Sequence, residues 1–229
     1  MKQHWKKFVV GIIGLAAVVF AASFIYVKFV EEEADPELTS QDVKDRLDAS
    51  APDPIAGVDG DWLIADGSEV GYRVDESINF VPTTANGRTK AITGTFTIDG
   101  TVVTTGEFTV DMTTFKSDKP RRDGQFNGRI MAVDQFPTAT FVLTSPIDFL
   151  QVPTDGTTIT ASATGELTLR GITEAVTFDV EATFANGGVG VLGKIPVVFA
   201  DYGIPNPSFA TITTEDNGLL EFVLIFDRA

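Results

Sequence analysis

The sequence predicts an all-β protein, an antiparallel β-barrel of about eight strands preceded by one N-terminal transmembrane helix. Nine Asn-Gly or Asp-Gly dipeptides follow residue 57, and such pairs favour the tight turns of β-hairpins. Between them, apolar and polar residues alternate with the period of half-buried antiparallel strands. A single uncharged apolar run, residues 8–27, precedes this region. The chain therefore divides into a membrane segment, a spacer and one β-domain.

The apolar run at 8–27 is long enough to cross a bilayer. As a helix its 20 residues would span about 30 Å, the thickness of the hydrocarbon core. Three lysines precede the run and three glutamates follow it, so the positive-inside rule places the N-terminus in the cytoplasm. We expect a single-pass cell-membrane protein with a cytoplasmic tail at 1–7, a transmembrane anchor at 8–28 and an extracytoplasmic remainder. A cleaved signal peptide is the alternative, because residues 21–23 are small enough for cleavage.

Residues 29–56 are acidic and poor in aromatic side chains, and we expect an acidic stalk. Residues 31–56 hold nine acidic side chains against two basic ones. A short helix is expected at 37–47, but Leu38 and Leu47 are too sparse to build a core. We interpret the segment as a solvated spacer, with a partner-binding acidic segment as the alternative. A flexible coil of this length would reach about 25–30 Å.

Residues 57–229 are expected to form the barrel domain. In five stretches the apolar side chains fall on alternate positions and so share one face of a strand. These are Ile92, Gly94, Phe96 and Ile98; Phe108, Val110 and Met112; Ala139, Phe141 and Leu143; Val176, Phe178, Val180, Ala182 and Phe184; and Leu220, Phe222, Leu224 and Phe226. An eight-stranded barrel is either filled by side chains or just wide enough for one small ligand. Rings that alternate with Gly94 and Ala182 would line a slot, but they would equally make a filled core.

Composition excludes several classes of function. Residues 57–229 carry 23 acidic and 11 basic side chains, so this domain repels phosphate backbones and nucleic acid is a poor partner. The chain has no cysteine, and its one histidine, His4, precedes the apolar run. Disulfides, thiolate metal sites, Ser-His-Asp triads and His-ligated metals or haem are therefore excluded from the domain. The classes of function that remain for the domain are carboxylate chemistry and binding.

Three ordered sequence blocks in the domain carry a family resemblance. The first, at 59–74, contains Trp62, Ser68, Val70, Tyr72 and Val74. The second, at 121–141, contains an Arg-Asp pair, a Phe and the pattern Pro-x-Ala-x-Phe, and the third, at 164–184, contains Leu-Thr-x-x-Gly-x-Thr. With these blocks the domain resembles the YceI-like family of bacterial polyisoprenoid-binding proteins, which have a lipocalin-like barrel. The loop at 201–209 is similar to versions in actinobacterial members.

The resemblance implies an elongated apolar tunnel that holds an isoprenoid quinone or a polyprenyl phosphate. The side chains expected to line it are Phe96, Phe108, Val110, Phe141, Leu143, Phe178, Val180, Phe184, Phe222 and Leu224. The expected partners are this long-chain isoprenoid lipid and the plasma membrane. Many relatives are thought to form homodimers, and the sequence leaves the oligomeric state open. Arg170 and Gly67 stand where the family often has His, so any chemistry of those histidines is absent here.

A basic cluster interrupts the acidic domain. It consists of Lys116, Lys119, Arg121, Arg122 and Arg129. Because guanidinium groups pair well with phosphate, the three arginines are candidates for binding an anionic headgroup. The alternative is local pairing with Asp118, Asp123 and Asp134, which would fix a loop.

Two other functions compete with lipid binding. One is a surface or structural interaction protein with a filled core. The other is a glycosidase-like hydrolase that uses paired carboxylates. The acidic side chains fall mostly on outward strand faces or in turns, where burial raises no carboxyl pKa. We therefore expect a binding protein rather than an enzyme, with no metal and no certain cofactor.

Overall fold

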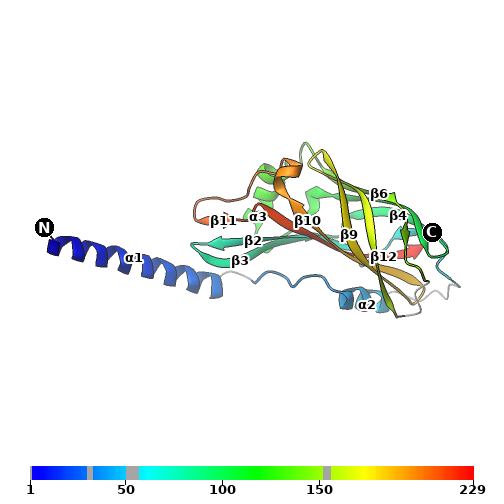
Figure 1. Ribbon diagram of the computed structural model, residues 1–229, viewed down its shortest axis with the longest axis horizontal. Helices are drawn as coiled ribbons and strands as arrows, with labels where there is room; N and C mark the ends of the chain where they lie inside the picture. Colours follow the sequence, from blue (N-terminus) through cyan, green and yellow to red (C-terminus); the bar gives the residue numbers. More distant parts are fainter. Residues whose placement is uncertain (1, 30–32, 50–56, 152–155) are drawn as a thin grey trace.

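The computed structural model describes residues 2–29, 33–49, 57–151 and 156–229 (Figure 1). In this part of the chain, eight antiparallel strands form a closed barrel in the spatial order β1-β4-β5-β6-β8-β9-β10-β12, and pairing of β12 with β1 closes it. The strands are β1 (Gly60–Ile64), β4 (Ile92–Asp99), β5 (Val102–Asp111), β6 (Thr138–Ser145), β8 (Thr158–Leu169), β9 (Ile172–Ala185), β10 (Gly188–Val198) and β12 (Asn217–Arg228). The predicted all-β barrel of about eight strands is confirmed.

A β-hairpin extends the barrel at one end. It consists of β2 (Glu69–Ile78) and β3 (Val81–Thr89), and β2 pairs with the first half of β12 while β1 pairs with the last residues of β12. The short strand β11 (Ile212–Thr214) pairs with the outer part of β2. The other elements are short: β7 (Ile147–Asp148), the 3₁₀ helices η1 (Met112–Thr114) and η3 (Phe199–Tyr202), the helix α3 (Pro120–Gln125) and the π-helical turn η2 (Phe126–Ile130).

The alternation of apolar and polar residues in the sequence corresponds to an alternation of buried and exposed side chains in the structure. On β9, Phe178 and Val180 are buried, whereas Thr177 and Asp179, which alternate with them, are exposed. The inward side chains of the strands form the main apolar core together with aromatic residues from the connections. Since successive side chains on a strand point to opposite faces, one buried face per strand requires this pattern.

The N-terminal helix α1 (Lys2–Phe29) is long and apolar enough over Phe8–Phe29 to cross a membrane, the one such helix among the described residues. Within Phe8–Phe29 the best 18-residue stretch has a mean hydropathy of 2.7, and only 6% of it is buried inside the protein. Figure 1 shows the helix extending away from the barrel. A membrane anchor and a signal sequence both have these properties. The prediction of one N-terminal apolar helix of spanning length is confirmed.

The expectation of a solvated spacer is wrong for residues 35–49, which we call the strap. Leu38, Val43 and Leu47 are at most 1% exposed, because they pack against apolar side chains on the outer face of the barrel. The helix α2 (Ser40–Ala49) carries two of them and contacts β9, β10 and β12 (Figure 1). Three apolar side chains cannot build a core alone, but they complete a patch that the strands already provide.

Polar contacts also hold the strap. Glu221 on β12 is fully buried beneath it, where its carboxylate accepts a hydrogen bond from the Leu38 N–H at 3.0 Å. The other carboxylate oxygen accepts from Arg88 Nη2 at 3.0 Å. The Leu38 N–H and Arg88 thus satisfy the buried charge of Glu221, which would otherwise be costly. Next to Leu38, Glu37 of the strap lies 2.5 Å from Lys194 on β10.

Candidate functional site

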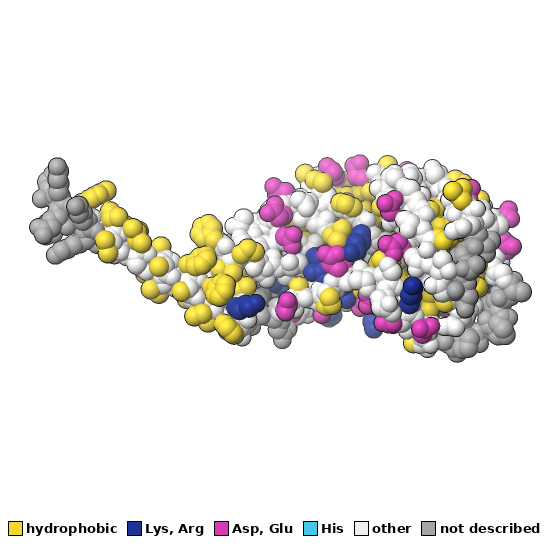
Figure 2. Space-filling model, turned by 60° about the horizontal axis from the view of Figure 1, so that its bottom comes forward, with side chains coloured by type: hydrophobic (Ala, Val, Ile, Leu, Met, Phe, Trp, Pro, Cys, Tyr) yellow, Lys and Arg dark blue, Asp and Glu magenta, His cyan; other side chains and the backbone are white. Residues whose placement is uncertain are grey.

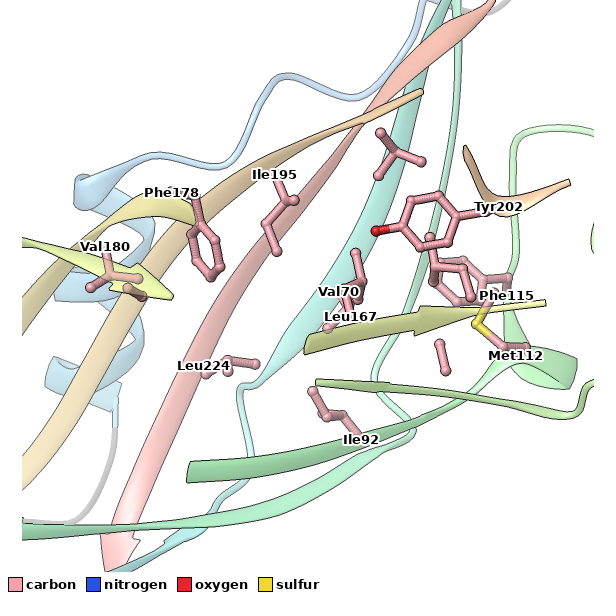
Figure 3. Close-up of a cluster of buried hydrophobic side chains, with 14 of the residues drawn as sticks. Val70, Ile92, Met112, Phe115, Leu167, Phe178, Val180, Ile195, Tyr202 and Leu224 are labelled. Carbon is pink, nitrogen blue, oxygen red and sulfur yellow. The ribbon is translucent and has the colours of Figure 1, made fainter. Parts of the chain in front are cut away.

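The barrel encloses an elongated apolar space, which we call the inner hollow. It has a volume of about 160 Å³, and it runs from Val70 and Ala139 in the middle of the barrel to Thr101 at the turn between β4 and β5. Its accessible wall is entirely apolar. Figure 3 shows Phe178, Ile195 and Leu224 pointing from three different strands into this interior. An apolar tunnel of this kind accepts hydrocarbon and offers no polar partner to water.

The ten side chains predicted to line a tunnel all line the inner hollow. They are Phe96, Phe108, Val110, Phe141, Leu143, Phe178, Val180, Phe184, Phe222 and Leu224. The alternation missed others that complete the wall, among them Ile159, Ala163, Leu167, Val189 and Val191. These residues belong to β8 and β10, whose small and glycine-rich sequences give a weaker apolar alternation.

Rings that lie over glycines keep the inner hollow open. The pairs are Phe222 with Gly193, Phe108 with Gly94, and Phe141 with Gly165. A Cβ added at Gly193 would come within 2.2 Å of Phe222 Cζ, so this ring occupies the space of the missing side chain. Glycine within a strand often marks such a close approach. The rings therefore lie along the wall of the barrel rather than across its interior.

A second space, the outer hollow, adjoins the first and has a volume of about 420 Å³. It lies between the β2–β3 hairpin, β11 and the α3–η2 segment, and its wall includes Tyr72, Phe126 and Phe209. Val70, Val110, Ala139 and Leu220 line both spaces. Small-molecule sites commonly have volumes of about 300–1,000 Å³, so the outer hollow alone is large enough for a ligand.

The structure divides the basic cluster. Lys119, Arg121 and Arg122 line the outer hollow. Arg122 pairs with Asp118 and lies 3.5 Å from Glu76, as the local-pairing alternative expects for Asp118. Arg121 is exposed, and within the described part of the chain no hydrogen bond or ion pair holds its guanidinium.

The other two cations lie outside both hollows. Lys116 is 3.7 Å from Asp123 and mostly exposed. Arg129 donates to the backbone carbonyls of Asn206 at 3.1 Å and Pro207 at 3.0 Å. Arg129 therefore fixes the 201–209 loop, and sequence spacing alone could not separate this role from that of Arg121.

Two neutral phenols and one carboxylate lie in or near the outer hollow. Burial raises the pKa of Tyr72, which lines this hollow, above its ordinary value, and burial raises the pKa of Tyr202 to about 12. Both phenols are therefore neutral at physiological pH. Of the described residues, Glu76 is the one carboxylate that lines either hollow. A glycosidase mechanism needs two carboxylates on either side of the scissile bond, so the hydrolase hypothesis finds no support in these walls.

A family model described as "YceI-like domain" matches residues 63–226. Among solved structures, BcnA of Burkholderia cenocepacia is similar with a TM-score of 0.54 and 22% identity, over 69% of this chain and 95% of that one. A polyisoprenoid binding domain from Saccharophagus degradans, implicated in plant cell wall breakdown, is similar with a TM-score of 0.60 and 14% identity, over 75% of this chain and all of that one. At these identities the likeness shows a shared fold. No curated protein matches the chain.

Proposed function

Because the chain belongs to the family of YceI-like domain proteins, we propose that it is a membrane-tethered, extracytoplasmic protein that holds a long-chain isoprenoid lipid in its barrel. The observation that carries this proposal is the pair of adjoining hollows, of which the inner one has an apolar wall along much of the barrel. Burial of a methylene group contributes about 0.8 kcal/mol, so about ten buried carbons supply several kcal/mol after ordering costs. The polyisoprenoid binding domain of Saccharophagus degradans shares the fold, which supports the same class of ligand.

The lipid is oriented with its hydrocarbon chain in the inner hollow and its polar end in the outer hollow. Lys119, Arg121 and Arg122 favour an anionic end such as a prenyl phosphate over a neutral quinone ring. Arg121 is the first candidate for this contact, because Arg122 already has carboxylate partners. The proposed anchor is α1, with the N-terminus in the cytoplasm and the barrel outside.

The alternative function is a surface scaffold with a filled core. A filled core would leave no connected space inside the barrel. The shared lining of the two hollows at Val70, Val110, Ala139 and Leu220 argues against this alternative.

The test is the lipid content of the full-length protein purified from bacterial membranes, measured by solvent extraction and mass spectrometry. Wild type should carry a polyisoprenoid. Val110→Trp, at the junction of the two hollows, should lose it. Thr109→Trp is the matched control, because it places the same ring on the outer face of the same strand and should retain the lipid.

Two further variants test the headgroup contact in the same measurement. Arg121→Gln should reduce the bound lipid with an unchanged melting temperature, whereas Lys116→Gln, which removes an exposed cation outside both hollows, should leave the lipid in place. A wild-type protein without lipid, or equal lipid in Val110→Trp and wild type, would contradict the proposed function.

A further inference from the structure

The strap fixes the barrel close to the end of α1. The backbone carbonyl of Asp35 accepts a hydrogen bond from Arg73, and its carboxylate accepts one from Asn86 at 3.2 Å. Arg88 donates to the carbonyl of Pro36 at 2.5 Å. Asp35 and Pro36 are therefore bound to β2 and β3, and the rest of the strap lies on β9, β10 and β12. Only the residues between Phe29, where α1 ends, and Asp35 remain as a tether.

The length of this tether limits the height of the barrel above the membrane. Six residue steps separate Phe29 from Asp35, and a fully extended chain covers about 3.3–3.6 Å in each, so the tether spans at most about 20 Å. Without the strap, the whole of residues 30–56 would act as a spacer. Docking of the strap thus replaces a long spacer with a short one.

The β2–β3 hairpin is as long as the tether. Arg73 and Asn86, to which the strap binds, face each other in register, and the hairpin continues from them to Ile78 and Val81. At about 3.3 Å per residue the five steps to Ile78 cover about 17 Å, and the turn at Asn79 and Phe80 brings the arm to about 20 Å. Figure 1 shows the arm running toward α1, and α1 contacts β3. The tip of the hairpin therefore reaches the membrane surface if α1 spans the bilayer.

The tip is aromatic and has no charge. Phe80 lies at the turn with φ +69° and is 88% exposed, and Phe209 in the neighbouring loop is 55% exposed. The two turns are joined by a hydrogen bond from the Asn79 N–H to the Thr211 carbonyl at 2.9 Å. We call Asn79, Phe80, Phe209 and Thr211 the lip. A left-handed conformation is unusual for a bulky residue, and here it holds the Phe80 ring away from the protein.

The surroundings of the lip differ from the rest of the barrel surface. Residues 77–87 and 202–214 contain no Lys, Arg, Asp or Glu, in a domain that otherwise carries many acidic groups. Figure 2 shows acidic side chains scattered over the barrel and hydrophobic ones covering α1. An acidic surface is repelled by anionic lipids, so an uncharged aromatic end is the part best suited to contact a bilayer.

We propose that the lip rests in the interfacial layer of the bilayer that α1 crosses, with Phe80 and Phe209 among the lipid headgroups. This inference rests on the proposed function for the membrane anchor. Phe209, Thr211 and Ile212 also line the outer hollow, as does Tyr26 of α1. The outer hollow therefore opens beside the membrane, and a lipid enters it without crossing water.

The test uses the full chain in lipid nanodiscs, with a fluorophore on single cysteines. Because the chain has no cysteine, Phe80→Cys, Phe209→Cys, Leu150→Cys and Ala16→Cys each label one position. Leu150 is the matched control, because it is also apolar, 84% exposed and left-handed (φ +61°), but follows β7, beside the β4–β5 turn. Ala16 lies in the middle of α1. The quencher is carried by lipids at a depth of about 5–10 Å.

Strong quenching at 80 and 209, with none at 150, would support the proposal. No quenching at 80 and 209 while position 16 is quenched would overturn the lip contact and leave the anchor of the proposed function in place. No quenching at any position, 16 included, would overturn both the anchor and the lip. Equal quenching at 80 and 150 would also overturn the proposal, because the barrel would then lie on its side.

Discussion

The absence of a side chain at Gly193 shapes the interior of the barrel. Phe222 on β12 lies over Gly193 on β10, and the two residues pair in register. Were any side chain present at 193, the ring would have to leave the wall. A Phe-rich barrel is therefore hollow because specific rings lie over glycines, which composition alone does not indicate.

We expect Gly193→Ala to move the Phe222 ring into the inner hollow and to lower the amount of bound lipid. The three atoms nearest to the added Cβ all belong to the Phe222 ring, and this ring has an empty space to enter. Overpacking a core costs about 1–3 kcal/mol, and the adjacent space places this variant at the lower end. Lipid content by mass spectrometry and the free energy of unfolding by denaturation measure the two effects.

Gly190→Ala is the matched control for this prediction. Gly190 lies on the opposite face of β10, where an added Cβ would come within 2.3 Å of Val43 on the strap. We expect this variant to loosen the strap and to keep the lipid. Equal lipid loss in both variants would mean that β10 is disturbed as a whole and that the ring over Gly193 has no special role.

Sequence reasoning at this scale succeeded for the strands and failed for the loops. The period of two assigns each strand residue to one face, so the lining from Phe96 to Leu224 could be predicted without knowing which strands are neighbours. The basic residues lie in an irregular segment, where contacts depend on tertiary structure. Arg129 binds a loop about 77 positions away in sequence, and no local pattern indicates that pairing.

At the scale of elements, the strap is the feature that the sequence underestimated. Its three apolar residues are too few to predict burial, but β12 carries a complementary signal. Residues 222–226 read Phe-Val-Leu-Ile-Phe, without alternation, which is typical of a strand buried on both faces. Val223 and Ile225 are fully buried on the outer side, beneath the strap. A strand of this kind on the outside of a barrel predicts that another segment covers it.

Docking of the strap should weaken in acid. The hydrogen bond from Lys194 holds the pKa of Glu37 below its ordinary value of 4.5, and hydrogen bonds from Thr39 hold the pKa of Asp42 below 3.8. Lys194 belongs to the barrel, so ionised Glu37 stabilises docking directly, whereas Thr39 belongs to the strap, so ionised Asp42 stabilises the start of α2, the helix that docks. This stabilisation is present above the ordinary pKa values of the two carboxylates. This contribution is lost as the pH falls through the lowered values. A fluorophore at Asp45→Cys, exposed on α2, should therefore gain mobility below pH 4.5.

Glu37→Gln with Asp42→Asn is the control for this acid transition. It removes both titrating groups, so the remaining change in fluorescence anisotropy should shrink. Circular dichroism at each pH establishes that the barrel itself stays folded. An acid transition of unchanged size in the double variant would show that other carboxylates control docking.

At the scale of the whole molecule, the distances between α1, the strap and the hairpin arm decide how these three parts are placed relative to one another. The helix α1 ends at Phe29, the strap begins at Asp35, and the hairpin arm between the strap and the lip matches the tether in length. With α1 as the proposed membrane anchor, the strap sets how far the outer hollow lies from the bilayer, although no strap residue lines either hollow. The sequence predicts an N-terminal apolar helix and a β-barrel, but the packing contact that docks the segment between them is seen only in the structure.

Releasing the strap should lengthen the tether without emptying the barrel. In Val43→Asp with Leu47→Asp, two buried apolar side chains become charged, which removes more than the roughly 2–5 kcal/mol that truncation of one such side chain costs. The free segment 30–56 would then behave as a coil with a reach of about 25–30 Å. Energy transfer between a donor at Leu150→Cys and an acceptor in the lipid headgroups should therefore fall, and loading of lipid from the bilayer should slow. The amount of lipid bound at equilibrium should stay the same, because the strap lines neither hollow. Unchanged energy transfer in a variant whose strap has become sensitive to protease would show that the lip or α1, rather than the strap, holds the barrel at the membrane.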